Sequence, residues 1–196
     1  MSWGKFIRIY RQLFSACSSL RNNVFIRLII AYFMEDLIIH LSDCDVKFVE
    51  IDFFIFEDKD KVYENYKKLG VNPCLKPHEH GKKRFCTFRI DTQYSCKKGI
   101  YCFALDNTIV YVGRCLNNFG KRINMGYGHI SPRNCFPGGQ STNCRINAEI
   151  YKSYFVDKRA VRFGIFPVLL NNEIVKLERK ILHECGSSLI WNIQKK

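Results

Sequence analysis

The residues from Gly99 to Gly113, GIYCFALDNTIVYVG, carry the strongest indication of how this chain folds. This stretch contains the apolar run Ile100 to Leu105, the turn-forming pair Asp106 and Asn107, and a second apolar run, Thr108 to Val112. Two short apolar runs joined by such a pair are typical of a β-hairpin. The stretch therefore predicts two antiparallel strands.

Further elements follow on both sides of the hairpin. Downstream, Asn117 or Asn118 can cap a short helix that places Phe119 and Ile123 on one face, with Arg122 at the edge of that face. The remaining predicted elements are a β-rich run at Val46 to Phe56, a short helix at Lys59 to Leu69, a strand at Arg84 to Ile90, a helix from Thr142 or Asn143, a strand at Ala160 to Val168, and a last helix from Asn172 to about Glu184, stopped by Gly186. This order predicts an α+β fold with a small three-stranded antiparallel sheet flanked by helices and an N-terminal α/β extension.

The chain divides by composition into three parts. A Pro- and Gly-containing polar segment, Pro73 to Lys83, marks the clearest break. We therefore expect a small accessory region at 34–83 and the main domain at 84–196. Residues 1–33 form a basic extension, which is either helical, a presequence, or an artefact of a start upstream of Met34.

The net charge of +13 is unevenly distributed. Lys82 to Lys196 contains 20 Lys and Arg residues against 7 Asp and Glu, whereas Met34 to Gly81 contains 11 acidic against 6 basic residues. A basic half is typical of a surface that binds a polyanion, because cations that contact phosphates release condensed counterions. A field that only keeps the protein in solution is the alternative.

The ten cysteines are irregularly spaced and no secretory signal precedes them. This favours a reducing, intracellular and cytoplasmic location, in which most of them are small buried side chains. One cluster supplies zinc-ligand types, namely Cys74, His78, His80 and Cys86, but without a CxxC pair, so a structural Zn²⁺ ion is the less favoured interpretation.

The apolar segment Val24 to Leu41 raises the question of a membrane span. Arg27, Glu35 and Asp36 interrupt it, and a span requires a longer uninterrupted run. We therefore predict a packed helix and no membrane association.

A carboxylate interrupts the apolar face of the last helix. At 100° per residue, Glu178 falls in the stripe formed by Ile174, Leu177, Ile181, Leu182 and Cys185. An ionised carboxylate in such a place is costly unless a cation or hydrogen-bond donors compensate it. Two readings remain open, a buried ion pair and a ligand for a divalent metal ion, with Glu149 as the second-choice carboxylate.

The hairpin reads Gly99-Ile100-Tyr101 on its first strand and Tyr111-Val112-Gly113 on its second, which resembles the two name-giving motifs of the GIY-YIG nuclease family. Arg122, Glu178 and Asn192 follow in the order that the family shows, so the resemblance covers roughly residues 98–193. It implies a DNA endonuclease in which Tyr, Tyr, Arg, Glu and Asn face one cleft. Arg114 is a departure, since many members have a small polar residue there.

A shared cleft requires one particular register of the hairpin. A strict two-residue turn would pair Tyr101 with Val112 and Tyr111 with Cys102, placing the tyrosines on opposite faces. A three-residue or bulged loop that includes Thr108 would pair Tyr101 with Gly113 and Phe103 with Tyr111 instead. We predict the bulged form, with both phenols on one face.

The resemblance also implies a role for each site residue. Glu178 would hold Mg²⁺ or Mn²⁺, Arg122 would brace the phosphate, and Tyr101 would accept a proton from water. Tyr111 would orient the water or the phosphate, with His129 as an alternative base, and Asn192 would position the groups on the metal side. The residues expected to contact nucleic acid are Arg114, Lys121, Arg133 and Arg145.

The expected partner is DNA, with RNA and a second copy of the chain left open. The short tail after Asn192 favours a restriction-like or phage-type nuclease over a homing enzyme. Two other classes compete with this hypothesis: a catalytically inactive nucleic-acid-binding module and a zinc-stabilised interaction domain.

Overall fold

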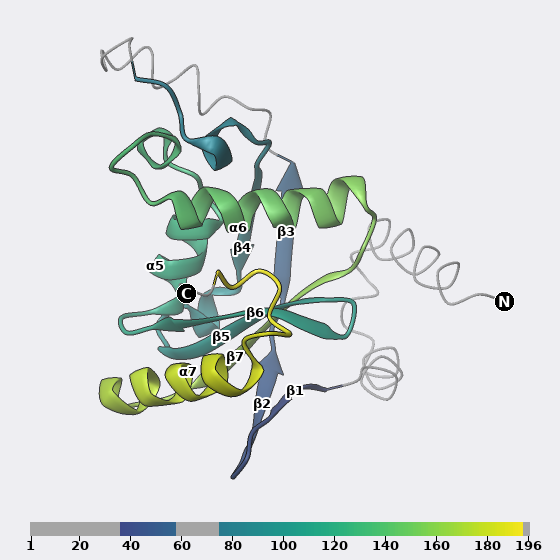
Figure 1. The fold of residues 1–196 in the computed structure, drawn as a ribbon, viewed down its shortest axis with the longest axis vertical. Coiled ribbons are helices and arrows are strands. Elements are labelled where there is room, and N and C mark those ends of the chain that lie inside the picture. The colour runs from purple at the N-terminus through teal and green to yellow at the C-terminus, as the bar shows by residue number, and fades with distance from the viewer. Residues whose placement is uncertain (1–35, 58–74, 194–196) are drawn as a thin grey trace, which may run out of the picture. The chain divides into compact units, whose positions relative to one another are not determined.

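Five strands form the main sheet of the protein, which a computed structural model describes over residues 36–57 and 75–193 (Figure 1). In sheet order they are β1 (Leu37–His40), β2 (Asp45–Glu50), β7 (Val161–Pro167), β5 (Gly99–Leu105) and β6 (Thr108–Cys115). Every neighbouring pair is antiparallel. A separate two-stranded sheet consists of β3 (Phe53–Glu57) and β4 (Cys86–Ile90).

The predicted α+β class is confirmed, whereas a sheet of only three strands is not. The three expected strands, β5, β6 and β7, do pair with one another. The sheet then continues because β2 pairs with β7 through Val49 opposite Ile165, and the half-buried side chain of Arg162 bonds to Glu50 at 2.5 Å. This pairing joins segments more than a hundred residues apart, and no local pattern encodes such a partner.

Short helical elements connect the strands and cover the sheet. The α-helices are α4 (Thr92–Ser95), α5 (Phe119–Arg122), α6 (Ser141–Tyr151) and α7 (Asn171–Cys185). Two 3-10 helices, η2 (Glu79–Lys82) and η4 (Pro132–Cys135), and two π-helices, η3 (Ile123–Tyr127) and η5 (Lys152–Val156), complete the helical elements described. As predicted, the side chain of Asn118 caps α5 and Gly186 ends α7.

The hairpin strands bury both of their faces. Tyr101, Phe103 and Tyr111 point to a core that also contains Phe119 of α5 and, from α6, Ile146 and Ile150. The alternate residues Ile100, Cys102 and Val112 point to a second core, which α7 completes with Ile174 and Ile181. In Figure 1, α6 and α7 accordingly lie on opposite sides of the hairpin strands.

Two predicted helices differ from the structure or fall outside it. Leu37–His40, the end of the expected helix Val24 to Leu41, is a strand in which Leu37 and Ile39 are buried and alternate with more exposed residues, the spacing of a sheet edge rather than a helix. The rest of that segment and the helix expected at Lys59 to Leu69 lie outside the described residues. Within the described ranges, no helix combines the length and the apolar character needed to traverse a bilayer.

Candidate functional site

The hairpin register places both motif tyrosines on one face, as predicted. Tyr101 lies opposite Gly113 and Phe103 opposite Tyr111. The predicted bulge is present, but it lies inside β6 rather than in the loop. Leu105 pairs with Thr108 across a two-residue turn, and the register shifts beyond Ala104 so that Val110 is the extra residue.

Three phenols and one guanidinium meet at the end of this face. The hydroxyl of Tyr101 donates to that of Tyr127 at 3.0 Å, and the hydroxyls of Tyr111 and Tyr127 are also 3.0 Å apart. Arg122 donates from Nε to the Tyr101 hydroxyl at 3.3 Å and from Nη2 to the Tyr127 hydroxyl at 2.8 Å. We call these four residues the phenol cluster.

Tyr127 was not among the residues predicted from the sequence. It lies in a glycine-rich loop of no clear periodicity, and the π-helical turn η3 brings it back beside Arg122, five positions earlier. A buried asparagine on α6, Asn147, fixes this turn: its amide nitrogen donates to the carbonyls of Tyr127 and Cys86, and its Oδ1 accepts from the Cys86 amide. An aromatic residue between two glycines in the basic half was the available signal.

Gly113 is required by the close approach of the Tyr101 ring. A Cβ atom at position 113 would lie 2.5 Å from the Tyr101 hydroxyl oxygen and 3.0 Å from a ring carbon of Tyr111. Both rings are buried and cannot swing aside. The glycine of the second motif is therefore explained by steric exclusion at the cluster.

Burial keeps the motif phenols protonated. Desolvation raises the pKa of Tyr101 well above its ordinary value, and the neighbouring phenols Tyr127 and Tyr111 raise it further. Desolvation and the neighbouring Tyr127 likewise raise the pKa of Tyr111. The positive charge of Arg122 acts in the opposite direction on both groups and is outweighed. In this state of the site, both side chains are neutral hydrogen-bonding groups.

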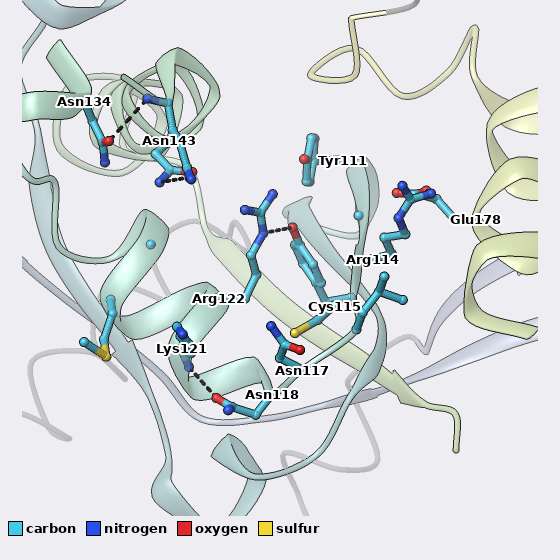
Figure 2. Close-up of a pocket in the computed structure, with 16 residues that line it drawn as sticks. Tyr111, Arg114, Cys115, Asn117, Asn118, Lys121, Arg122, Asn134, Asn143 and Glu178 are labelled. Atoms are coloured by element: carbon cyan, nitrogen blue, oxygen red, sulfur yellow. Dashed lines mark hydrogen bonds and ion pairs between the residues drawn. The ribbon is translucent and has the colours of Figure 1, made fainter. Parts of the chain in front are cut away.

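A cavity of about 750 Å³ opens above the phenol cluster. Figure 2 shows Arg122 near its middle, the pair Arg114 and Glu178 to one side, and Asn134 and Asn143 to the other. The lining contains three cations, Arg114, Lys121 and Arg122, and Glu178 is the single carboxylate among the described residues that line it. The volume suits a ligand of nucleotide size, and the charge favours an anion.

Glu178 reaches this cavity from the opposite side of the sheet to the tyrosines. It lies on α7, which packs on the second core, and its side chain is 15% exposed. One carboxylate oxygen accepts from Arg114 Nη1 at 2.6 Å. Because β6 is the outer strand of the sheet, the cavity extends around its edge and receives groups from both faces. The carboxylate is thus partly buried, and Arg114 is a cation that compensates it.

Asn192 binds the backbone of β6 rather than lining the cavity. Its Oδ1 accepts from the Val112 amide at 3.0 Å and its Nδ2 donates to the Val112 carbonyl at 2.8 Å. The preceding residue, Trp191, donates its backbone amide to Val110. These bonds occupy the open edge of the strand that carries Tyr111, so Asn192 positions the site without touching its contents.

The other predicted residues lie at different distances from the phenol cluster. Lys121 lines the cavity. His129 and Arg133 are exposed and are not among the lining residues. The guanidinium of Arg145 donates to the Trp191 carbonyl at 2.5 Å, which ties α6 to the C-terminal segment. The structure therefore brings together Tyr101, Tyr111, Arg114, Lys121, Arg122 and Glu178, and it leaves the other predicted side chains outside the cavity.

The donor set of the cavity fits a magnesium-like ion better than a transition metal. Mg²⁺ binds through one or two carboxylates and completes its shell with water and substrate phosphates. Glu178 supplies one carboxylate, and the amide oxygens of other lining residues, such as Asn117, are also hard donors. The described lining residues include no histidine and a single carboxylate, that of Glu178.

The suggested zinc ligands are partly engaged in other contacts. His78 Nδ1 accepts from the Gly81 amide and Nε2 donates to the Asn134 carbonyl. Cys86 is buried, with its thiol against the Asn147 carbonyl, and Cys74 lies outside the described ranges. Among the residues that the structure describes, no three His, Cys, Asp or Glu side chains are grouped closely enough to hold a metal ion. No disulfide joins any two of the eight described cysteines.

Comparison with known proteins finds no match for this chain. No protein-family model matches the chain, no curated protein matches it, and no solved structure matches it.

Proposed function

We propose that this chain is a metal-dependent endonuclease that hydrolyses phosphodiester bonds in DNA. One observation carries the proposal: the two motif tyrosines, Arg122 and Glu178 come from four separate elements and line a single cavity. Packing alone does not require a guanidinium, a buried carboxylate and two phenols to converge on one opening. The resemblance to GIY-YIG nucleases, which rests on the same residues, supports the same function.

The charges of the cavity support binding of a phosphate. Arg122 is held in place by two hydroxyl groups, which bond to its Nε and Nη2 atoms, and its side chain lines the cavity. A guanidinium fixed in this way stabilises the charge that gathers on a pentacoordinate phosphorus during hydrolysis, at little cost in reorganisation. Lys121 adds a second cation on the same wall.

Glu178 is the residue proposed to hold the divalent ion. When bound, Mg²⁺ supplies positive charge that acidifies a coordinated water and offsets the charge of the phosphate. Glu178 is suited to this role because α7, the helix that carries it, is packed against the sheet and therefore held in place. The remaining contacts of the ion would be water and a phosphate oxygen.

The phenols are proposed to orient the attacking water. As neutral groups, Tyr101 and Tyr111 each offer a hydroxyl that can donate or accept. The role of proton acceptor that the resemblance implies for Tyr101 requires cations to outweigh the burial that raises its pKa. Tyr127 bonds to both hydroxyls, so it holds them in one geometry and adds a fifth member to the proposed site.

The wall of the cavity opposite Glu178 carries side-chain amides that could recognise DNA bases. Asn134, Gln140 and Asn143 all line the cavity, and Asn143 Nδ2 donates to Gln140 Oε1 at 3.0 Å. Side-chain amides pair with adenine through two hydrogen bonds. A sequence-selective enzyme of the restriction or phage type is consistent with this wall, and its target sequence follows from cleavage mapping.

The test is incubation of the purified protein with supercoiled plasmid, in Mg²⁺ and in chelator. We expect nicking and linearisation in Mg²⁺ only, and loss of both in the variants Glu178→Ala and Arg122→Ala. Glu173→Ala is the matched control, because Glu173 is an exposed carboxylate on the same helix, and it should cut like the wild type. If Glu178→Ala retained full cutting, the proposal would be wrong.

A catalytically inactive DNA-binding module is the second candidate. The specific observation in its favour is that the carboxylate of Glu178 already has a cationic partner, Arg114. Such a module would bind plasmid with normal affinity and leave it supercoiled in every divalent ion.

A further inference from the structure

The ion pair between Arg114 and Glu178 joins two residues with competing roles. Arg114 lies near the end of β6, opposite Ile100, and therefore points to the side of the sheet that α7 covers. Its Nη1 atom is 2.6 Å from Glu178 Oε2. The arginine side chain is 41% exposed and that of Glu178 is 15% exposed. The arginine can therefore leave the pair and become hydrated more readily than the carboxylate can.

A divalent ion at Glu178 would compete with this guanidinium. Both are cations, and both need the lone pairs of the same partly buried carboxylate. Among the described lining residues, Glu178 is the one carboxylate, so the ion has no alternative anionic ligand there. Binding of the ion therefore favours release of Arg114.

A released Arg114 is well placed for a phosphate. It lines the same cavity as Arg122 and Lys121, and its guanidinium offers the two parallel donors that a phosphate accepts. A phosphate that takes Arg114 away from Glu178 in turn frees the carboxylate for the ion. Each ligand thus removes an obstacle to the other.

We propose that Arg114 is an internal counter-ion that exchanges between Glu178 and a DNA phosphate, so that divalent-ion binding and DNA binding strengthen each other. The inference rests on the proposed nuclease function and deepens it, because it makes Arg114 a phosphate-binding residue that also keeps the ion site closed until substrate arrives. The coupling is reciprocal by thermodynamic necessity.

The first test measures Mn²⁺ affinity without DNA, from the electron paramagnetic resonance signal of the free ion. Arg114→Gln should bind Mn²⁺ about five- to tenfold more tightly than the wild type, because the competitor is gone. Lys121→Gln is the matched control, since it removes an equal charge from the same cavity but leaves the pair intact, and its gain should be about twofold or less. Glu178→Gln should lose the site.

These outcomes separate the two proposals. If Glu178→Gln bound Mn²⁺ as the wild type does, the ion site and with it the proposed function would fail. If Glu178→Gln lost the ion but Arg114→Gln behaved like Lys121→Gln, only the exchange would fail.

The second test measures the affinity for a short DNA duplex by fluorescence anisotropy, in chelator and in Ca²⁺, which takes similar oxygen ligands. In chelator, Arg114→Gln should change the affinity by less than about twofold, because Glu178 holds the arginine; in Ca²⁺ the same substitution should weaken binding about fivefold or more. Glu178→Gln should tighten binding in chelator, and this gain should vanish in the Arg114→Gln background. An equal loss in both conditions, or no loss in either, would overturn the exchange.

Discussion

Tyr127 contacts more of the proposed site than any residue recognised from the motifs. Its hydroxyl is bonded to Tyr101, Tyr111 and Arg122, and its side chain is fully buried. A single oxygen thus sets the positions of three groups. The properties of the site should depend on this atom as strongly as on the motif residues themselves.

Replacing Tyr127 by Phe removes that oxygen and keeps the ring. We expect a loss of about 1–3 kcal/mol in the free energy of unfolding, because buried donors are left short of a partner. Plasmid cutting should fall about 10- to 100-fold, since Arg122 loses one of its two anchors. Urea unfolding and initial cutting rates measure the two effects. Tyr94→Phe is the control, because Tyr94 is only partly buried and packs against Lys97 instead; equal effects of the two substitutions would contradict this role.

The raised pKa values of the motif phenols predict how stability changes at alkaline pH. In the folded protein the pKa of Tyr101 and of Tyr111 lies above the ordinary value of 10.0. Above about pH 10 the unfolded chain therefore releases protons that the folded chain retains, and this favours unfolding. Stability should be level up to about pH 9 and then fall, by up to about 1.4 kcal/mol per pH unit for each group.

Denaturant unfolding at a series of alkaline pH values measures this slope. Tyr111→Phe should have a shallower fall than the wild type because one of the groups is removed. Tyrosinate absorbance that rose by the full amount for these residues before the protein unfolded would show that the phenols ionise in the folded state.

The residues of the site were predicted with unequal success for physical reasons. Tyr101, Tyr111, Arg122 and Glu178 carry local signals, namely strand alternation, a helix edge and a charge on an apolar stripe. Tyr127 carries only the weak signal of an aromatic residue between two glycines, because a π-helical turn follows no regular spacing and this turn is fixed by Asn147 from another helix. The sequence predicts that a cation compensates Glu178, but it does not say which one. Arg114 becomes its partner only because α7 packs on the side of β6 from which Arg114 projects.

At the scale of elements, α7 combines two tasks on one face. Ile174 and Ile181 are completely buried against the sheet, and Glu178 stands between them in sequence and reaches the cavity. The same packing that stabilises the helix therefore aims the carboxylate. Stability and activity should separate when the two kinds of residue are changed.

Ile174→Ala should reduce the free energy of unfolding by about 2–5 kcal/mol, because it leaves a cavity in the second core. Glu178→Gln should cost about 1 kcal/mol or less, since Arg114 can turn to solvent, yet it should abolish plasmid cutting. Urea unfolding and cutting assays below the unfolding midpoint provide both measurements. A Glu178→Gln variant as unstable as Ile174→Ala would mean that the pair serves mainly the fold.

The hairpin and α7 were predictable as elements, whereas the bulge was placed only approximately. The need for two phenols on one face required one extra residue in the hairpin, and that requirement was correct. The bulge lies at Val110 because Ile109 and Ala104 pair with each other and both pack into the second core. This pairing keeps the two-residue turn and leaves Val110 as the extra residue. The sequence has no short-range signal for this choice.

At the scale of the whole molecule, the sheet crosses the boundary expected near residue 83. β1 and β2 contribute Leu37, Val46 and Phe48 to the second core. The turn between them is also bonded to α7, because Ser42 donates from its amide and hydroxyl to the carboxylate of Glu184. The segment 36–57 thus completes the layer that holds Glu178.

A fragment of residues 84–196 should therefore fail to fold by itself. It lacks the strand that pairs with β7 and several side chains that are at most a few per cent exposed in the full chain, and the exposed β7 edge would favour aggregation. Circular dichroism and proton NMR of the fragment test this. Well-dispersed resonances and a cooperative melt like that of the full chain would show that 84–196 is an autonomous domain.

The rates of amide hydrogen exchange should differ strongly between the two walls of the cavity. β5 is buried along its whole length and has a bonded neighbour on each side, so its amides should exchange only when the molecule unfolds globally. Asn134 and Gln140 belong to a short turn and a loop, and their amides should exchange through local openings. The cavity would thus have one rigid wall, which carries the proposed catalytic groups, and one wall that opens locally. Substitutions in the second wall could then change which ligand binds without disturbing the first.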